Sequence, residues 1–295
     1  MAVPYKAPVK DIVFGYEVID SYNVLNKISA FSDFSEDIVI PTMEECAKFS
    51  EEVLAPINAI GDQQGATIKD GVVTMPEEFV DAYKKFAEAG WASISLPSDI
   101  GGGGMPITLS GGTLEILSTA NLAFGLAPGL SAGAISAINF HGNQEQKDKF
   151  LPKLVSGEWT GTMNLSEPQS GSDLGTITTK AEPQEDGSYK ITGTKVWITF
   201  GEHNMTENII HLVLAKVPGS PEGTKGISMF IVPKYIVNDD GSIGDSNNVS
   251  CISIEEKLGI HASPTCVMEY DGSVGYLVGE ENRGLNYMFT MMNEA

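Results

Sequence analysis

The feature that most constrains the fold is a change in the spacing of apolar residues near Trp159. Upstream they recur every three or four residues, as on helices; for example, a helix with Pro41 in its first turn would carry Cys46, Phe49, Val53 and Ile57 on one face. Downstream there are short runs rich in β-branched and aromatic residues: WTGTMNL, YKIT, KVWIT, IIHLVLAK, ISMFIVP and CVMEY. Helices followed by strands in separate blocks predict an α+β fold rather than alternating βαβ units.

This pattern divides the chain into three parts. We predict an N-terminal helical domain over residues 1–158, a middle β-domain over residues 159–280, and the start of a truncated C-terminal helical domain over residues 281–295. The β-domain should be a mainly antiparallel barrel or sandwich, with turns at Asp186-Gly187, Thr192-Gly193, Pro218-Gly219, Asp240-Gly241 and Asp271-Gly272. An apolar helix that opens at Met288 and stops by Ala295 needs something to pack against, so we expect a chain cut off inside a larger protein.

One stretch imitates a membrane span, since residues 116–139 carry no charge. A lipid-facing helix needs roughly 20 predominantly apolar residues, whereas this stretch is rich in Gly, Ala and Ser and contains Pro128. Small residues suit helices that pack closely inside a protein. We therefore expect a buried helical pair and no membrane association.

The charge balance limits the partners. The 18 Lys and Arg residues against 39 Asp and Glu residues give a formal charge of −21, which argues against nucleic-acid binding and against docking on an anionic membrane. Because acidic residues occur within the first twenty positions, we expect no signal peptide there. Cys46, Cys251 and Cys266 form neither a zinc signature nor a disulfide framework, so we predict no metal site, buried thiols and a cytoplasmic location.

Two segments have the composition of a binding site. The segment MNLSEPQSGSDLGT, from Met163 to Thr176, leads from a strand into a Ser- and Gly-rich loop that would expose N–H groups and hydroxyls to an anionic ligand. KVWIT, from Lys195 to Thr199, would place an indole face and a hydroxyl on one strand, where they suit a flat heterocycle. On composition alone, an ordinary turn and a core strand explain the same residues.

In sequence, SEPQSGSDLG followed by KVWIT resembles the flavin-binding signature pair of the acyl-CoA dehydrogenase family. HGNQEQKDKFLPKLVSGEW before it, and LGIHASPTCVMEYDG with VGEENRGLNYM after it, resemble the flanking segments in the same order, so the resemblance runs from about Glu44 onward. YKAPVKDIVF and EEKLGIHASPTCVMEY resemble most closely the branch that oxidises 3-(methylthio)propionyl-CoA during dimethylsulfoniopropionate breakdown.

The resemblance implies FAD as the cofactor and an acyl-CoA as the substrate. It assigns Leu165 and Ser166 to the pyrimidine side of the flavin, Ser172 to the pyrophosphate or the CoA, and Thr199 to flavin N5. The full set that it assigns to the cofactor is Met163, Leu165, Ser166, Gly171, Ser172, Trp197, Ile198 and Thr199, and the substrate residues are Ser172 and Asn293. Two positions depart from the family pattern: Asn164 replaces a small residue, and His261 replaces a frequent Arg.

In this family a Glu removes the α-proton of the thioester while the β-hydrogen leaves as hydride, and that Glu lies in the final helical domain. We therefore expect the base beyond Ala295 and assign no catalytic residue within the chain. The resemblance also implies a homo-oligomer that passes electrons to an electron-transferring flavoprotein. The alternatives are another acyl-CoA dehydrogenase or oxidase on the same scaffold, a nucleic-acid-binding relative, and an inactive fragment.

Overall fold

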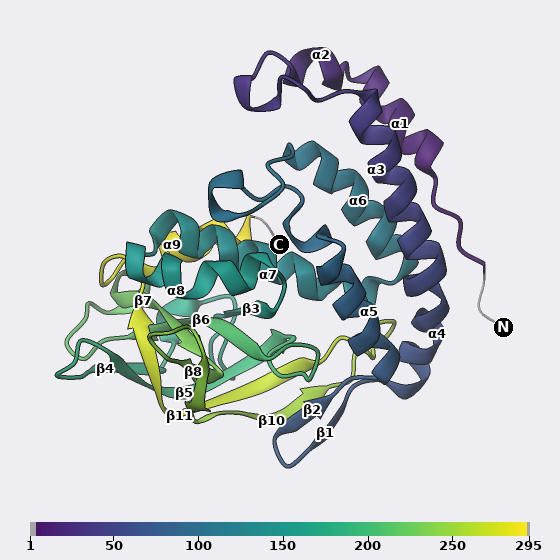
Figure 1. Cartoon of the computed structure of the whole chain (residues 1–295). Coiled ribbons are helices and arrows are strands. Elements are labelled where there is room, and N and C mark those ends of the chain that lie inside the picture. Colours follow the sequence, from purple (N-terminus) through teal and green to yellow (C-terminus); the bar gives the residue numbers. More distant parts are fainter. Residues whose placement is uncertain (1–3, 294–295) are drawn as a thin grey trace.

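The computed structural model describes residues 4–293 and confirms the α+β fold, with a helical part beside a β-domain (Figure 1). The helices are α1 (Val9–Val18), α2 (Ser21–Leu25), α3 (Glu36–Phe49), α4 (Ala55–Gln64), α5 (Glu77–Glu88), α6 (Ile107–Ala120), α7 (Leu122–His141), α8 (Gln144–Val155) and α9 (Gly284–Met292). The strands are β1 (Thr67–Lys69), β2 (Val72–Thr74), β3 (Trp159–Asn164), β4 (Lys180–Pro183), β5 (Tyr189–Thr199), β6 (Asn208–Lys216), β7 (Ile227–Pro233), β8 (Tyr235–Val237), β9 (Ile243–Ser246), β10 (Val249–Glu255) and β11 (Thr265–Leu277).

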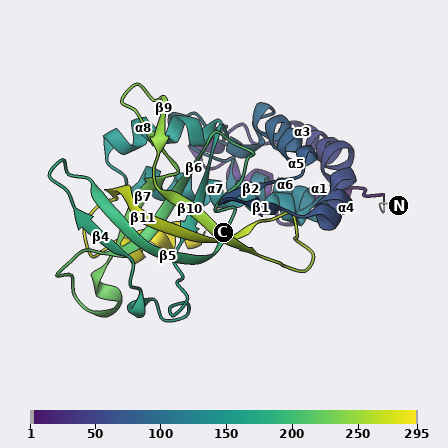
Figure 2. The ribbon, with the colours of Figure 1, turned by 90° about the horizontal axis from the view of Figure 1, so that it is seen from below.

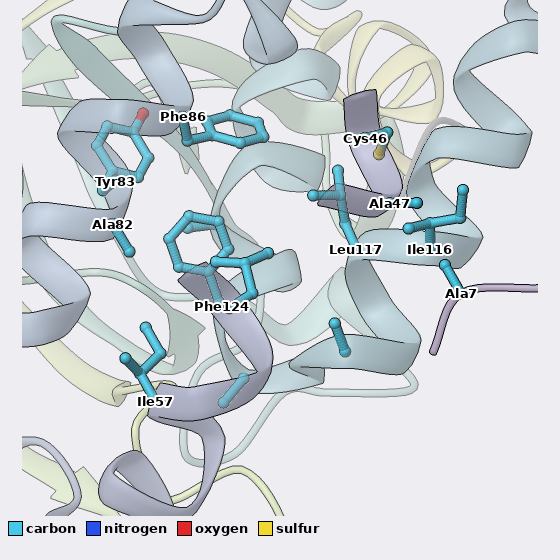
Figure 3. Close-up of a cluster of buried hydrophobic side chains, with 14 of the residues drawn as sticks. Ala7, Cys46, Ala47, Ile57, Ala82, Tyr83, Phe86, Ile116, Leu117 and Phe124 are labelled. Atoms are coloured by element: carbon cyan, nitrogen blue, oxygen red, sulfur yellow. The ribbon is translucent and has the colours of Figure 1, made fainter. Parts of the chain in front are cut away.

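The core of the helical part is built around Phe124 of α7. Its ring centroid lies 5.6 Å from that of Phe86 and 6.3 Å from that of Tyr83, both on α5. Figure 3 shows these rings with Ile57 of α4 on one side and the α3 and α6 side chains on the other. Each large aromatic ring buried between α5 and α7 contributes a large apolar area to the core of this part.

The expected helix start at Pro41 is wrong, because α3 begins at Glu36. Ser35 precedes it in an extended conformation, and Glu36 and Asp37 occupy the first turn, where carboxylates favour the positive end of a helix. Pro41 lies inside the helix, which forgoes one backbone hydrogen bond there. A π-helical stretch over Ser50–Leu54 then joins α3 to α4.

The uncharged stretch forms the end of α6 and most of α7, as expected for a buried helical pair. By length and hydropathy α7 could cross a membrane, but 56% of its most apolar window is buried in this structure. It packs on α6, α8, α9 and β3. The small residues permit this packing: a Cβ on Gly161 of β3 would come within 2.3 Å of the Ala134 side chain.

The β-domain closes on itself as a predominantly antiparallel ring in which β5, β4, β6, β7 and β11 pair in turn, with β10 and β3 at its sides. Two pairings are parallel, since β3 and β4 both run in the direction of β6. Seen from below, the strands cross beside the helical part (Figure 2). Loop contacts join the two parts, because Ala66 N donates to His261 O and the His261 ring lies 2.8 Å from Asp62 O.

Two of the predicted turns are wrong. Thr192-Gly193 lies within β5, and Asp271-Gly272 lies within β11 beside a register shift. Gly193 is required there for space, because a Cβ at that position would come within 2.8 Å of the Thr179 Cα. The glycine therefore allows a close backbone approach inside the sheet, which the sequence does not distinguish from a turn.

Alternate residues of β3 carry a buried polar row, which consists of Thr160, Thr162 and Asn164. Thr160 Oγ1 lies 2.9 Å from His203 Nε2, and Thr162 Oγ1 lies 2.7 Å from His211 Nδ1. Burial, reinforced by the charge of Lys234, lowers the pKa of each histidine to about 3. Both rings are therefore neutral in the folded protein at neutral pH.

These histidines predict a loss of stability in mild acid. The unfolded chain binds protons below pH 6.5 that the folded chain does not bind, so stability present above that pH falls as the pH drops. At about pH 5.5 each histidine should cost about 1.4 kcal/mol of unfolding free energy. Urea unfolding at pH 7.5 and 5.5 measures this change in the free energy of unfolding. In a variant with both histidines replaced by Gln, the free energy of unfolding should be nearly the same at the two pH values. Equal wild-type stability at both pH values would contradict the prediction.

Candidate functional site

The loop after β3 is anchored by the buried carboxylate of Glu167. It accepts hydrogen bonds from the backbone N–H and the hydroxyl of both Thr178 and Thr179, at 2.6–3.0 Å. Gln169 Nε2 donates to it at 2.7 Å. Since a buried carboxylate is costly unless its oxygens are satisfied, these donors fix the loop against the start of β4.

The charge partner of Glu167 is Lys195 of β5, whose Nζ lies 2.9 Å from Glu167 Oε1. The two side chains are 1% and 0% exposed. Burial by itself would raise the pKa of Glu167, but the Lys195 ammonium and the Thr178 and Thr179 donors hold it at about 2. Burial lowers the pKa of Lys195 to about 8, and Glu167 opposes this shift. The pair is therefore ionised at neutral pH.

The same lysine joins the loop backbone to β5. Lys195 Nζ also donates to Leu165 O at 2.9 Å, and Val196 N donates to Ser166 O at 2.9 Å. The two segments singled out in the sequence thus lie side by side. The N–H groups of Leu165 and Ser166 find no acceptor among residues 4–293, so they are available to a bound molecule.

Trp197 is turned out of the strand by a bulge. Ile198 pairs with Cys266 and Lys195 with Met268, so two residues of β5 stand opposite one residue of β11. Trp197 adopts φ +61°, which is rare for a bulky side chain and marks a strained position. Its side chain is 54% exposed, and a Cβ on Gly171 would lie 3.8 Å from the indole. The bulge therefore presents an indole face beside the 165–173 loop.

The other residues assigned to the cofactor fall into two groups. Ser166, Ser172 and Thr199 are at least partly exposed, and their hydroxyls form no hydrogen bond within the described part of the chain. Met163 is half-buried, whereas the Ile198 side chain lies in the β-domain core, so only its main chain can face a ligand. Unpaired hydroxyls on the loop and on β5, together with an exposed indole on the same strand, suit a polar, flat ligand.

The tip of the loop offers donors for an anion. The backbone N–H groups of Gly171, Ser172 and Asp173 lack an acceptor within residues 4–293, and they follow one another along the chain. Successive free N–H groups can form an anion-binding concavity. Asp173 instead uses its carboxylate to accept from Gly175 N, which shapes the loop.

The structure does not bring Asn293 into this group of residues. It follows α9, which packs on α7, β6 and β7, and its assignment to the substrate stays a prediction. Of the two departures, Asn164 is buried, where it donates to Thr162 Oγ1 and accepts from Tyr270 OH. His261 contacts Asp62 and Glu256 at the junction of the two parts.

The sequence did not single out Glu167 or Lys195, although their ion pair joins the loop to β5. The available signal was a charged residue in each of the two segments, one of them on a strand with apolar neighbours. A lysine on a strand is ordinarily a solvated residue, so only the tertiary contact distinguishes it.

The fold matches that of acyl-CoA dehydrogenases. The family model of the acyl-CoA dehydrogenase N-terminal domain matches residues 41–158, and that of the middle domain matches residues 162–273. Together these ranges make up most of the chain. The chain belongs to the acyl-CoA dehydrogenase family.

Within this family, the chain is 47% identical over 291 residues to 3-methylmercaptopropionyl-CoA dehydrogenase of Ruegeria pomeroyi, covering 99% of this chain and 50% of that one. It is 37% identical over 303 residues to a butyryl-CoA dehydrogenase of Syntrophomonas wolfei, covering 98% and 50%. An acyl-CoA dehydrogenase from Bacillus anthracis complexed with FAD superposes with a TM-score of 0.71 at 27% identity, covering 89% and 40%. The chain spans about half the length of the curated relatives it matches.

The anchoring role of Glu167 predicts a large stability effect. Glu167→Ala should lower the free energy of unfolding by about 3–5 kcal/mol, because it leaves Lys195 buried without a counter-charge. Chemical denaturation followed by circular dichroism measures this. Glu88→Ala is the control, since Glu88 is mostly exposed and its Lys84 partner lies 4.0 Å away, so its midpoint should stay essentially unchanged. Equal midpoints for both variants would refute the anchoring role.

Proposed function

We propose that this chain forms the FAD-binding half of an acyl-CoA dehydrogenase. The observation that carries the proposal is the group of unused donors beside an exposed, strained Trp197. The indole suits the flat isoalloxazine ring, and the N–H groups of Leu165 and Ser166 suit its carbonyl oxygens. The free N–H groups at Gly171–Asp173 and the Ser172 hydroxyl suit a pyrophosphate. The residues present therefore fit FAD.

For the substrate we propose an acyl-CoA thioester, most specifically 3-(methylthio)propanoyl-CoA, oxidised to 3-(methylthio)acryloyl-CoA. The support is the 47% identity to a dehydrogenase named for that substrate. Another short acyl-CoA is the alternative, since a butyryl-CoA dehydrogenase is 37% identical over nearly the same length. When bound, FAD would accept the β-hydrogen as hydride, and the residues of this chain would bind and orient the ring.

We further propose that the general base, and the cover that excludes water from the site, come from the portion of the longer relatives that this chain does not match. A base must reach the α-proton at about hydrogen-bond distance, and an open site weakens electrostatic stabilisation of the developing charge. A cytoplasmic homo-oligomer and an electron-transferring flavoprotein as acceptor complete the proposal. An oxidase would instead pass the electrons to oxygen and release hydrogen peroxide. A peroxide assay therefore distinguishes an oxidase from a dehydrogenase.

The first test is cofactor binding. The purified protein should take up FAD, with the flavin quenching the fluorescence of exposed Trp197. In Trp197→Phe, most of the fluorescence decrease on addition of FAD should be lost. In Trp159→Phe this decrease should remain, because Trp159 is buried in the β-domain. The measurement is fluorescence titration together with the visible spectrum after gel filtration. A protein that stays colourless and shows no saturable quenching would refute the proposal.

The second test concerns the reaction. FAD-loaded protein is mixed anaerobically with 3-(methylthio)propionyl-CoA or butyryl-CoA, and flavin bleaching is followed for this chain and for a form as long as its relatives. Bleaching should be confined to the longer form and faster with the sulfur-containing substrate. Comparable bleaching by residues 1–295 would place a base within this chain. No bleaching by either form would refute the proposed activity.

The family resemblance places the Thr199 hydroxyl at flavin N5. Thr199→Val in that longer form should therefore slow flavin reduction about tenfold or more, with little change in substrate affinity. A hydrogen bond to a developing charge contributes roughly 1.5–3 kcal/mol, and the Thr199 hydroxyl has no acceptor or donor partner within the described residues. Stopped-flow reduction measures the rate. Thr194→Val, elsewhere on β5, is the control and should reduce at the wild-type rate. An unchanged rate for Thr199→Val would make Thr199 a strand residue only.

A further inference from the structure

The Leu165–Ser166 peptide group carries a contact that anchoring alone does not require. Its carbonyl accepts from Lys195 Nζ at 2.9 Å, and its N–H has no acceptor within residues 4–293. Glu167 already receives four donors from Thr178 and Thr179 besides the lysine. The lysine thus joins a buried carboxylate to one particular peptide bond at the ligand-facing edge of the loop.

Stability is a weak explanation for this arrangement. Replacing a buried ion pair by apolar residues of similar volume is often neutral or stabilising. A hydrogen bond to a peptide carbonyl, however, polarises the whole peptide group, and hydrogen bonds in a chain strengthen one another in a low-dielectric setting. Lys195 is fully buried, so water screens its effect on this peptide very little.

We infer that Lys195 is a positioning residue that polarises the Leu165–Ser166 peptide and so strengthens the Ser166 N–H as a donor to the flavin ring. The inference rests on the proposed function and deepens it, because it identifies a residue that acts on the cofactor without touching it. Glu167 holds the ammonium in place, and Lys195 transmits its charge through one hydrogen bond to a main-chain donor that faces the ligand. Val196 N, bound to Ser166 O, holds the next peptide group along the loop, Ser166–Glu167, against β5.

The test compares Lys195→Met with Thr179→Val. Lys195→Met removes the donor to Leu165 O. Thr179→Val is the matched control, because it removes a 2.6 Å hydrogen bond to Glu167 in the same buried network but leaves the Lys195–Leu165 contact in place. The first readout needs no flavin: in the deuterated 31.5 kDa protein, NMR reports the Ser166 amide proton and the Leu165 carbonyl carbon. The second readout is the dissociation constant for FAD.

We expect Lys195→Met to move both resonances upfield and to raise the FAD dissociation constant about tenfold. Thr179→Val should lower the unfolding midpoint but leave the two resonances and the dissociation constant near their wild-type values, because both Thr178 donors, the Thr179 N–H and Lys195 still hold Glu167. Resonances that stay unchanged in Lys195→Met, or that move equally in both variants, would overturn the inference and leave Lys195 a structural residue.

If Lys195→Met does not fold, Lys195→Met/Glu167→Gln takes its place, because it removes both buried charges. Its amide oxygen still accepts from one of the two threonines, and its amide NH2 can donate to the hydroxyl of the other. The same upfield movement is expected there, and its absence would overturn the inference. Failure of the wild-type protein to bind FAD would count against the proposed function instead. The NMR comparison would still decide whether Lys195 polarises this peptide.

Discussion

The ion pair between Glu167 and Lys195 is the constraint on which the site depends. It joins a loop after β3 to the middle of β5, two segments separated by 28 residues in the sequence. Because both charges are fully buried, neither can leave the pair without a large desolvation cost. The loop therefore has one favourable position relative to the strand, and the backbone donors of residues 165–173 are held in a fixed arrangement before any ligand binds.

Strain at the neighbouring bulge has a complementary role. A tryptophan with φ +61° is unfavourable by itself and persists only where its surroundings determine the backbone. Here the β5–β11 ladder continues on both sides of the bulge, and the Lys195 anchor precedes it directly. The result is a large apolar ring directed outward from an otherwise well-packed strand. Preorganised donors and a preorganised ring surface reduce the ordering cost of binding a flat cofactor.

The sequence predicted the order of helices and strands because the two hydrophobic periods differ so strongly on either side of Trp159. It was less reliable at the boundaries, since Pro41 signals a helix start and yet lies within α3. It was also wrong at Gly193, because glycine serves both turns and close strand contacts, and only the position of Thr179 across the sheet separates the two. Predictions from local chemistry fail where a distant residue decides the outcome.

The same argument explains which site residues the sequence could identify. Trp197, Thr199 and the serines carry recognisable ligand chemistry, so they could be named from the motifs alone. Lys195 and Glu167 bind nothing outside the chain, and in sequence a charged residue on a strand is more often solvated than buried. Their importance follows only from burial, which converts an ordinary pair of charges into an anchor. Residues with ligand chemistry of their own can thus be proposed from pattern, whereas those that hold them in position require the tertiary structure.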